Sequence, residues 1–365
     1  MLFRSQADDR ERGVFPTTLR VGPHITPDDA YKSARLSIAE AFVSGITTLH
    51  DWSGNVPSPQ HADAELQALK ECGIRARFSY GPSPTLGVSM PMDMGDIGRV
   101  NRQWSREDGM LSIGAAVRTP GPGMRGEVPL DMIASEVAAI RKLGLPFTIH
   151  GGNKNLISAL ASRELLGPDL LMVHAQGMTA EERQAVADSK TGYSISPVIE
   201  MSFSAVRNGY IQFAELEALH APLALSIDSS GVGNADYFNV MRALLWSNWR
   251  RTDVDLKLQL NPKRIVELAT IEGARRLGVG DVTGSLKPGK RADLITVRTN
   301  DINMAPAGDP YYSLVFFAQP QNVDLVVANG RVVSQGGRLT TIDMNKTIRE
   351  ASEAADALAA RVPKK

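Results

Sequence analysis

The segment from Pro146 to Gln176 constrains the fold most, because it holds two short apolar runs that each end in a histidine. The first run ends in His150 and the second in His174, and residues 155–166 between them have helical character. Parallel strands joined by a helix bring their carboxyl ends to the same edge of a sheet. A single histidine after an apolar run is more often structural, but the same position in two successive units favours one shared pocket.

A third apolar run, residues 222–227, ends in Asp228. Two neutral imidazole nitrogens and one carboxylate make a ligand set suited to a divalent ion. We therefore predict a metal site formed by His150, His174 and Asp228, for zinc or another divalent metal such as iron.

Apolar runs alternate with amphipathic helical segments from residue 26 to Asp228, after an irregular start over residues 1–25. The expected strands are 46–49 (leading into His50), 74–80, 111–117, 147–149, 170–173, 193–196 and 222–227, and the longer helices are 27–43, 59–71, 96–104, 131–143, 236–249 and 261–277. Such alternation is typical of a parallel α/β architecture. Seven units predict a distorted (β/α)8 TIM barrel whose first strand is missing, with its site at the carboxyl ends of the strands.

The pattern changes at Gly284, where short strands are separated by Lys-Pro-Gly, Asn-Gly and Gly-Gly turns. We therefore divide the chain into a barrel over residues 1–283, a small all-β module over 284–342 and an amphipathic C-terminal helix within 343–365. The module would be the C-terminal half of a β-sandwich.

Composition limits the expected partners and location. Forty basic residues balance forty acidic ones, which argues against nucleic acid or an anionic membrane as the main partner. No apolar run is long enough to span a membrane. The single cysteine, Cys72, and the charged N-terminus without a signal peptide favour a cytoplasmic protein with a small-molecule substrate.

Five stretches of the chain are similar to motifs of one family, and together they cover nearly its whole length. They read GITTLHDW, TIH, MVHA, SIDSSGVGNADYFNVMR and, most specifically, ATIEGARRLGVGDVTGSLKPGKRADLITV. These stretches resemble the amidohydrolase superfamily, in particular its cytosine-deaminase-like and triazine-hydrolase-like branch.

The resemblance implies a metal-dependent hydrolase that attacks a non-peptide C–N bond of a small cyclic or amide-like substrate with a metal-activated water. It also implies roles for single residues. His150 and His174 would be metal ligands, Asp228 would be both a ligand and the general base, and His174 and Asp228 would form the catalytic pair.

The chain departs from the family pattern at two informative places. The first strand of the family carries a His-x-His pair, and no such pair occurs in these 365 residues. We therefore expect the chain to begin after that strand and to lack two usual ligands. Asn153 stands where the deaminase branch has a glutamate, three residues after the histidine of the fifth strand, which favours a hydrolase in which Asn153 hydrogen-bonds the substrate.

Two further residues are candidates for substrate contact. His50 ends the expected second strand, where a structural role is favoured over a substrate contact. Glu200 follows the strand expected over residues 193–196, which would be the seventh of a complete barrel. It is equally suited to bracing a loop or to contacting substrate.

The absent His-x-His pair supports a second hypothesis, which is a non-catalytic or N-terminally truncated homologue that has lost part of its metal site. The open edges of a seven-stranded sheet also predict association with another chain, most simply as a homo-oligomer.

Overall fold

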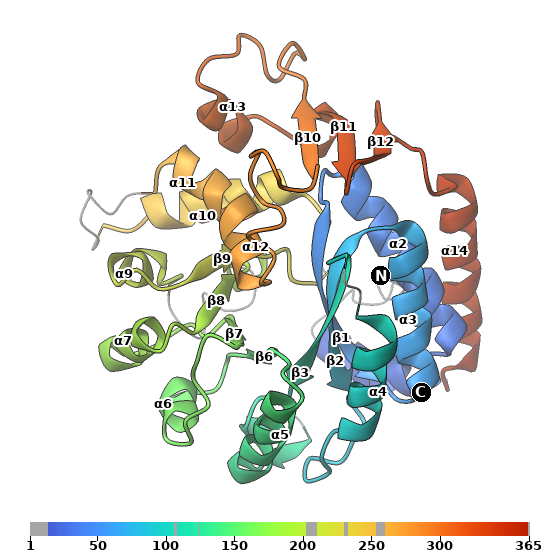
Figure 1. Ribbon diagram of the computed structural model, residues 1–365, viewed down its shortest axis with the longest axis vertical. Coiled ribbons are helices and arrows are strands. Elements are labelled where there is room, and N and C mark those ends of the chain that lie inside the picture. Colours follow the sequence, from blue (N-terminus) through green and yellow to red (C-terminus); the bar gives the residue numbers. More distant parts are fainter. Residues whose placement is uncertain are drawn as a thin grey trace.

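The computed structural model describes residues 14–105, 108–123, 125–201, 210–229, 233–252 and 260–363. In this part of the chain a seven-stranded parallel sheet of order β1-β2-β3-β6-β7-β8-β9 curls into a half-barrel covered by helices on its outer side (Figure 1). The strands are β1 (Thr48–Val56), β2 (Arg75–Pro82), β3 (Leu111–Val117), β6 (Phe147–His150), β7 (Leu170–Val173), β8 (Gly192–Ile195) and β9 (Leu223–Leu225). The predicted parallel α/β fold with seven strands is thus confirmed.

The helices that follow the strands form the outer layer. They are α3 (Pro59–Cys72), α4 (Met94–Trp104), α5 (Leu130–Lys142), α6 (Leu156–Ala161), α7 (Ala180–Asp188), α8 (Pro197–Ile199), α9 (Phe213–Ala218) and α10 (Tyr237–Trp249), and α2 (Pro27–Val43) precedes β1. The start of α2 illustrates how local chemistry sets these bounds. The Thr26 hydroxyl accepts from the Asp29 amide while the Asp29 carboxylate accepts from the Thr26 amide, which is a capping box.

The half-barrel is open because β1 and β9 lie at the two ends of the sheet, and no described strand pairs with the outer edge of either. A parallel sheet normally has both faces covered. Here the space between the two edge strands forms part of a large cavity, which contains the candidate site described below.

Two expectations for the N-terminal half were wrong. Residues 14–24 are not irregular but form α1 (Val14–Val21) and the 3₁₀ turn η1 (Gly22–His24). Val21 is buried against Ala351 and Leu358 of the C-terminal helix, a tertiary contact that local sequence does not reveal. Strand β1 also does not end at His50, because it stays paired with β2 as far as Val56.

The segment over residues 118–128, which follows β3, is mostly a hairpin. Strands β4 (Gly121–Gly123) and β5 (Gly126–Val128) pair in an antiparallel fashion. The hairpin follows β3 and contributes to the wall of a second, smaller cavity.

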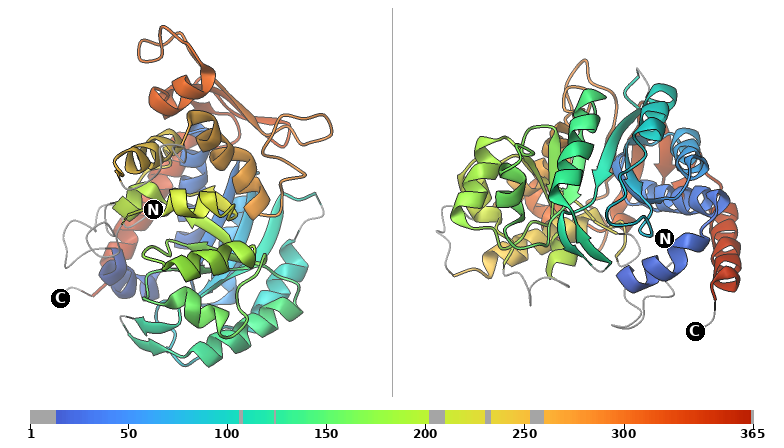
Figure 2. Two further views of the ribbon diagram at one scale, coloured as in Figure 1. Left: turned by 90° about the vertical axis from the view of Figure 1, so that its left-hand side faces the viewer. Right: turned by 90° about the horizontal axis from the view of Figure 1, so that it is seen from below.

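The C-terminal segment forms a four-stranded antiparallel sheet of β10 (Leu294–Val297), β11 (Val323–Ala328), β12 (Arg331–Gln335) and β13 (Arg338–Leu339). It is not all-β as expected, because α13 (Pro310–Phe316) lies between β10 and β11. Figure 2 shows this module at one end of the half-barrel. Helices α11 (Pro262–Glu267) and α12 (Gly273–Arg276), joined by a π-helical turn over Leu268–Glu272, lead into it.

The module and the half-barrel share one hydrophobic core, since buried Val326 and Val333 belong to the same cluster as the barrel strands. A buried salt bridge of 2.9 Å also joins Arg75 of β2 to Asp293 beside β10. Helix α14 (Met344–Arg361) packs along α2. The proposed division at residues 283/284 and 342/343 stays a prediction.

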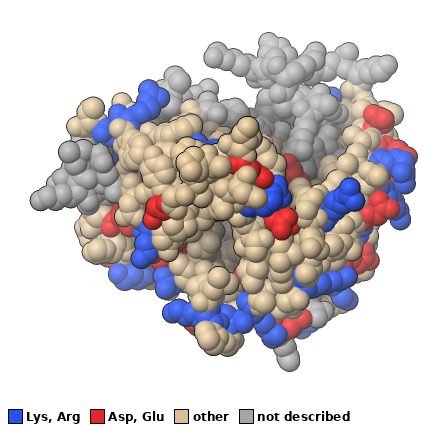
Figure 3. Space-filling model, turned by 90° about the horizontal axis from the view of Figure 1, so that it is seen from above, with Lys and Arg blue, Asp and Glu red and all other residues tan. Residues whose placement is uncertain are grey.

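Charged side chains of both signs are interspersed over the face shown in Figure 3, as expected for a chain with no net charge. Within the described residues, none of the helices has the length and apolar character needed to cross a membrane.

Candidate active site

The carboxyl ends of β6, β7 and β9 bring the three principal candidates together. The imidazole rings of His150 and His174 stack with 5.4 Å between centroids and 5° between planes. His174 Nε2 lies 3.4 Å from Asp228 Oδ2. All three side chains line a cavity of about 2660 Å³ inside the half-barrel.

Gly151 permits the close approach of the two histidines. A Cβ atom at this position would lie 2.4 Å from Ala175 Cα, so no other residue fits without moving the backbone. The glycine directly after His150 therefore allows the ends of β6 and β7 to converge.

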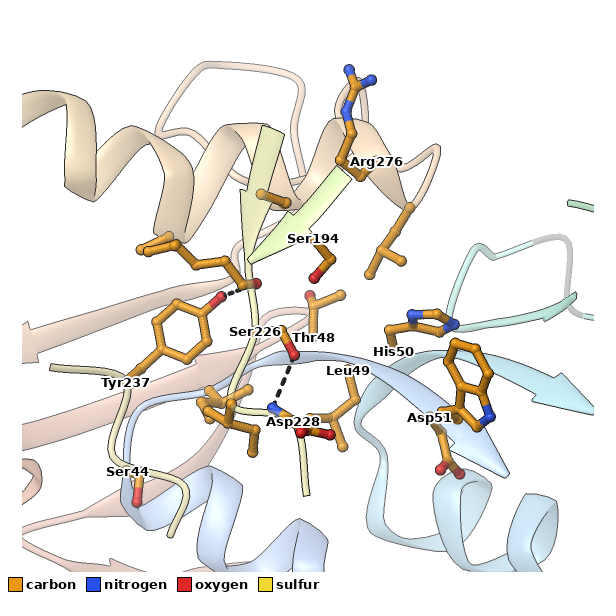
Figure 4. Close-up of a pocket in the computed structure, with 18 of the residues that line it drawn as sticks. Ser44, Thr48, Leu49, His50, Asp51, Ser194, Ser226, Asp228, Tyr237 and Arg276 are labelled. Atoms are coloured by element: carbon orange, nitrogen blue, oxygen red, sulfur yellow. Dashed lines mark hydrogen bonds between the residues drawn. The ribbon is translucent and has the colours of Figure 1, made fainter. Parts of the chain in front are cut away.

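His174 and Asp228 share an unusual backbone conformation. Their φ angles are +58° and +59°, in the left-handed region that non-glycine residues seldom occupy. Such conformations cost free energy and concentrate at functional sites. At Asp228 the turn is held by a 2.9 Å hydrogen bond from its amide to Ser226 Oγ (Figure 4).

Glu200 lies behind His174 rather than in the cavity, and its side chain is almost fully buried. Its carboxylate accepts from the Ser196 amide at 2.7 Å and from Gln176 Nε2 at 3.0 Å, and it lies 3.2 Å from His174 Nδ1. A carboxylate in this position orients the imidazole, as in the outer shell of many histidine sites. The sequence pattern predicts a loop-bracing or substrate-binding role for Glu200 but does not link it to His174.

The pKa values of His150 and His174, which lie at corresponding strand ends, are shifted in opposite directions. Burial, with a smaller contribution from His174, lowers the pKa of His150 to about 4. Burial also acts to lower the pKa of His174, but hydrogen bonds with Asp228 and Glu200 outweigh it and raise that pKa to about 9. Neutral His150 therefore presents a free nitrogen lone pair, whereas both nitrogens of His174 are engaged with carboxylates.

The described residues fit a metal ion only in part. His150 and Asp228 offer one neutral nitrogen and one carboxylate, which suit a divalent ion. However, no group of three or more His, Cys, Asp or Glu side chains within the described ranges is arranged to hold a metal. The three-ligand set of His150, His174 and Asp228 therefore stays a prediction.

Two buried polar atoms beside the cluster, Gln176 Oε1 and Ser196 Oγ, have no hydrogen-bond partner among the described residues. Buried polar groups are nearly always hydrogen-bonded. These two atoms could therefore each form a further hydrogen bond next to Glu200.

Asn153 and His50 are engaged with the protein. Asn153 Nδ2 donates to the Pro120 carbonyl at 2.7 Å and so braces the start of the β4–β5 hairpin. His50 Nε2 lies 2.8 Å from Ser79 Oγ, and burial followed by Arg77 lowers its pKa to about 3. Both residues line the large cavity, and their substrate-binding roles stay predictions.

Trp52 lies at the site, although a residue in its sequence position more often shapes the rim of a barrel than binds substrate. Its indole lies 3.9 Å from the His150 ring, centroid to centroid. The indole, tilted by 32° from the His150 ring, thus lies as a third ring against the stacked pair of His150 and His174. Because β1 continues past His50, side chains alternate in direction along it, and His50 and Asp51 lie on opposite sides of the strand (Figure 4).

Comparison with known proteins defines the family to which the chain belongs. Residues 3–333 match the amidohydrolase family. The chain is similar to the 5'-deoxyadenosine deaminase of Methanosarcina mazei, with 24% identity over 99% of this chain and 84% of that protein. It is also similar to the 5-methylthioadenosine/S-adenosylhomocysteine deaminase of Desulforudis audaxviator, with 25% identity over 97% and 82% of the two chains.

Solved structures share the fold. An adenosine deaminase from Xanthomonas campestris with bound zinc has a TM-score of 0.80 and 20% identity, covering 92% of this chain and 76% of that one. The zinc complex of atrazine chlorohydrolase from Arthrobacter aurescens has a TM-score of 0.79 and 18% identity, covering 93% and 80%.

The chain therefore belongs to the amidohydrolase family. Its enzyme class is that of the amidohydrolase-type hydrolases, which act on carbon–nitrogen bonds other than peptide bonds.

Proposed function

We propose that this protein hydrolyses a non-peptide C–N bond in a small cyclic or amide-like molecule, with the reacting carbon bound beside Asp228 and His174. The observation that carries the proposal is the placement of these two side chains, 3.4 Å apart at the wall of one large cavity. The deaminase activities named for similar proteins support the type of bond.

Each residue of the cluster has a distinct part in the proposed reaction. The Asp228 carboxylate would accept a proton from the attacking water and return it to the leaving nitrogen. His174, held at Nδ1 by Glu200, would hold the Asp228 carboxylate in position relative to the substrate. The stacked rings of His150 and Trp52 would form one wall of the reaction space.

The reaction is proposed to use a divalent metal, as the zinc in structures of similar proteins suggests. His150 and Asp228 would hold the ion, with His174 as the third candidate. When bound, the ion would supply Lewis-acid chemistry at the substrate.

The substrate is proposed to be a lactam, a cyclic urea or an aminated heterocycle other than a nucleobase. Asn153 cannot exchange a proton as a glutamate can, and its amide nitrogen is already bonded to the Pro120 carbonyl. A screen of amides, lactams, ureas and aminated or halogenated heterocycles, with and without added zinc, manganese or iron, tests the proposal. Release of ammonia or ring opening is expected for at least one class, and no turnover with any metal would overturn it.

A second candidate function is a non-catalytic member of the family, favoured by the absence of a three-ligand group from the described residues. Metal analysis of the purified protein separates the two candidates. Near-stoichiometric zinc or iron supports the hydrolase, whereas a metal-free chain that takes up no added ion supports the non-catalytic protein.

The outer edges of β1 and β9, which pair with no other strand in the described part of the chain, support a homo-oligomer as part of the proposal, because unpaired strand edges invite pairing with another chain. Light scattering tests this association, and a stable monomer over a wide range of concentration would contradict it.

A further inference from the structure

The smaller cavity beside the β4–β5 hairpin adjoins the candidate active site. Its volume is about 290 Å³, and Trp52 and His150 line both this small cavity and the large one. The Trp52–His150 stack, at 3.9 Å between centroids, therefore lies between the two spaces. A molecule that reacts beside His174 has the small cavity within reach on the other side of this stack.

The remaining lining of the small cavity is largely apolar. Its side chains include Leu19, Pro82, Pro84, Leu86, Val88 and Val128. A dry cavity of about 150 Å³ lined by aliphatic and aromatic side chains accommodates benzene. The small cavity thus has room for a ring-sized group and offers that group little hydrogen bonding.

Hydrogen bonds from two arginines hold the walls of this cavity in place. Arg118 donates to the carbonyls of Gly87 and Met90 and pairs with Glu136 at 3.3 Å. Arg125, in the turn of the β4–β5 hairpin, donates to the Pro84 carbonyl at 2.8 Å. The segment that carries Leu86 and Val88 is therefore tied to β3 and to the hairpin, so the cavity is largely pre-formed as binding sites usually are.

A further bond couples the same wall to the active site. Thr119 Oγ1 donates to the His150 carbonyl at 2.7 Å. The segment after β3 thus contacts the backbone of His150, while Trp52 contacts its ring. A group bound in the small cavity would touch Trp52 directly and lie next to a residue of the strand-end cluster.

We propose that the small cavity receives an apolar, ring-sized substituent of the substrate, and that Trp52 is a specificity-determining residue that contacts this substituent. The inference rests on the proposed function and narrows its substrate class. The preferred substrate carries, besides the scissile C–N bond, an aryl or branched alkyl group remote from the reacting carbon.

Ligand-observed ¹⁹F NMR with 4-fluorotoluene as the probe tests binding without requiring turnover. The wild-type protein is expected to bind the probe saturably. Val88→Trp, which fills the cavity, should weaken binding at least about tenfold, and Ile302→Trp, which adds the same side chain at a 98% exposed position, should not. Leu86→Trp is the second filling variant, and thermal melting confirms that each variant is folded.

Equal binding by the wild-type protein and both filling variants, or no saturable binding at all, would overturn the inference. A kinetic comparison then uses any substrate class found active, as a pair of compounds with and without a benzyl group. The benzylated member should have a kcat/KM at least about tenfold higher in the wild-type protein, and this advantage should vanish in Val88→Trp.

The two proposals fail in distinguishable ways. Cavity-dependent probe binding without turnover of any compound would refute the hydrolase and retain the apolar pocket. Turnover without any preference for the benzylated member would retain the hydrolase and refute the pocket.

Discussion

Two pairs of carboxyl groups lie in or next to the large cavity, and their surroundings differ sharply. Glu200 and Asp228 flank His174, at 3.2 Å from Nδ1 and 3.4 Å from Nε2. Asp51 of β1 and Glu65 of α3 form the other pair, and neither takes part in a salt bridge within the described part of the chain. Carboxylates that share a basic partner are stabilised in their charged form, whereas buried carboxyls without one are not.

The difference appears in the direction of the pKa values. Burial raises the pKa of Asp51 to about 6, and burial together with the charge of Asp51 raises that of Glu65 to about 8. Near His174 the same two residue types raise the pKa of the imidazole to about 9. The chain thus places acids with a basic partner on either side of His174, and acids without a salt-bridge partner among the described residues on β1 and α3.

The strongest test of this contrast is Asp228→Asn. We expect loss of about 10²- to 10⁴-fold in kcat, because the amide cannot accept the proton that a general base takes up. The melting temperature should stay close to the wild-type value, since the amide retains the size of the carboxylate. Asp188→Asn, at an exposed position of α7, is the matched control and should keep full activity. Unchanged turnover in Asp228→Asn would remove the catalytic role from this residue.

Glu200→Gln examines the other side of His174. Glutamine keeps the shape but removes the charge that orients the imidazole, so kcat should fall by about 10- to 100-fold. Addition of imidazole should not restore activity, because His174 is still present. If steady-state kinetics show only an increase in KM, Glu200 contacts the substrate and does not position His174.

Glu65→Gln tests the uncompensated pair through stability. Because the pKa of Glu65 is raised from 4.5 to about 8 in the folded protein, the folded state keeps a proton that the unfolded state has lost in this range. Stability must therefore decline as pH rises from 4.5 to 8. Glu65→Gln removes this penalty and should raise the melting temperature at pH 9 by about 2 °C or more, with little effect at pH 5.

Glu71→Gln on the same helix is the matched control with the opposite sign. Hydrogen bonds from Tyr31 and Gln67 lower the pKa of Glu71, so its charged form is stabilised by folding. Removing it should lower the melting temperature at pH 9 or leave it unchanged. The same rise in both variants would show that the effect arises from net charge and not from the Asp51–Glu65 pair.

Sequence patterns could predict the elements and the strand-end residues because these depend on local periodicity. The helix predicted over residues 27–43 matches α2, and the histidines at the ends of the predicted strands marked the edge where the rings of His150 and His174 meet. The opposite pKa shifts of those two histidines could not be predicted. They depend on Glu200, which is 26 residues from His174 and reaches it only in the fold.

Tertiary contacts also explain the other differences between the predicted and the observed structure. The long pairing of β1 with β2 placed Trp52 inside a strand, and only this placement puts the indole against His150. The left-handed backbone of His174 and Asp228 could not be predicted either, because aspartate and histidine adopt that conformation more often than most residue types but still uncommonly. One local signal was available for the convergence of the strand ends, which is the glycine directly after His150.

The smallest expected effect concerns His50. Its variants show whether this residue belongs to the reactive or to the structural residues of the strand ends. His50 is neutral, with its pKa lowered to about 3, and its main contact is the Ser79 hydroxyl at 2.8 Å. His50→Gln should therefore change kcat/KM less than Glu200→Gln does, and should lower the free energy of unfolding by about 1 kcal/mol through the lost hydrogen bond. Ser79→Ala is the matched variant and should cost a similar amount, with no added loss in the double variant. A large rise in KM for His50→Gln but not for Ser79→Ala would instead place His50 against the substrate, and the reactive surface would then extend from Asp228 across the open half-barrel to β1.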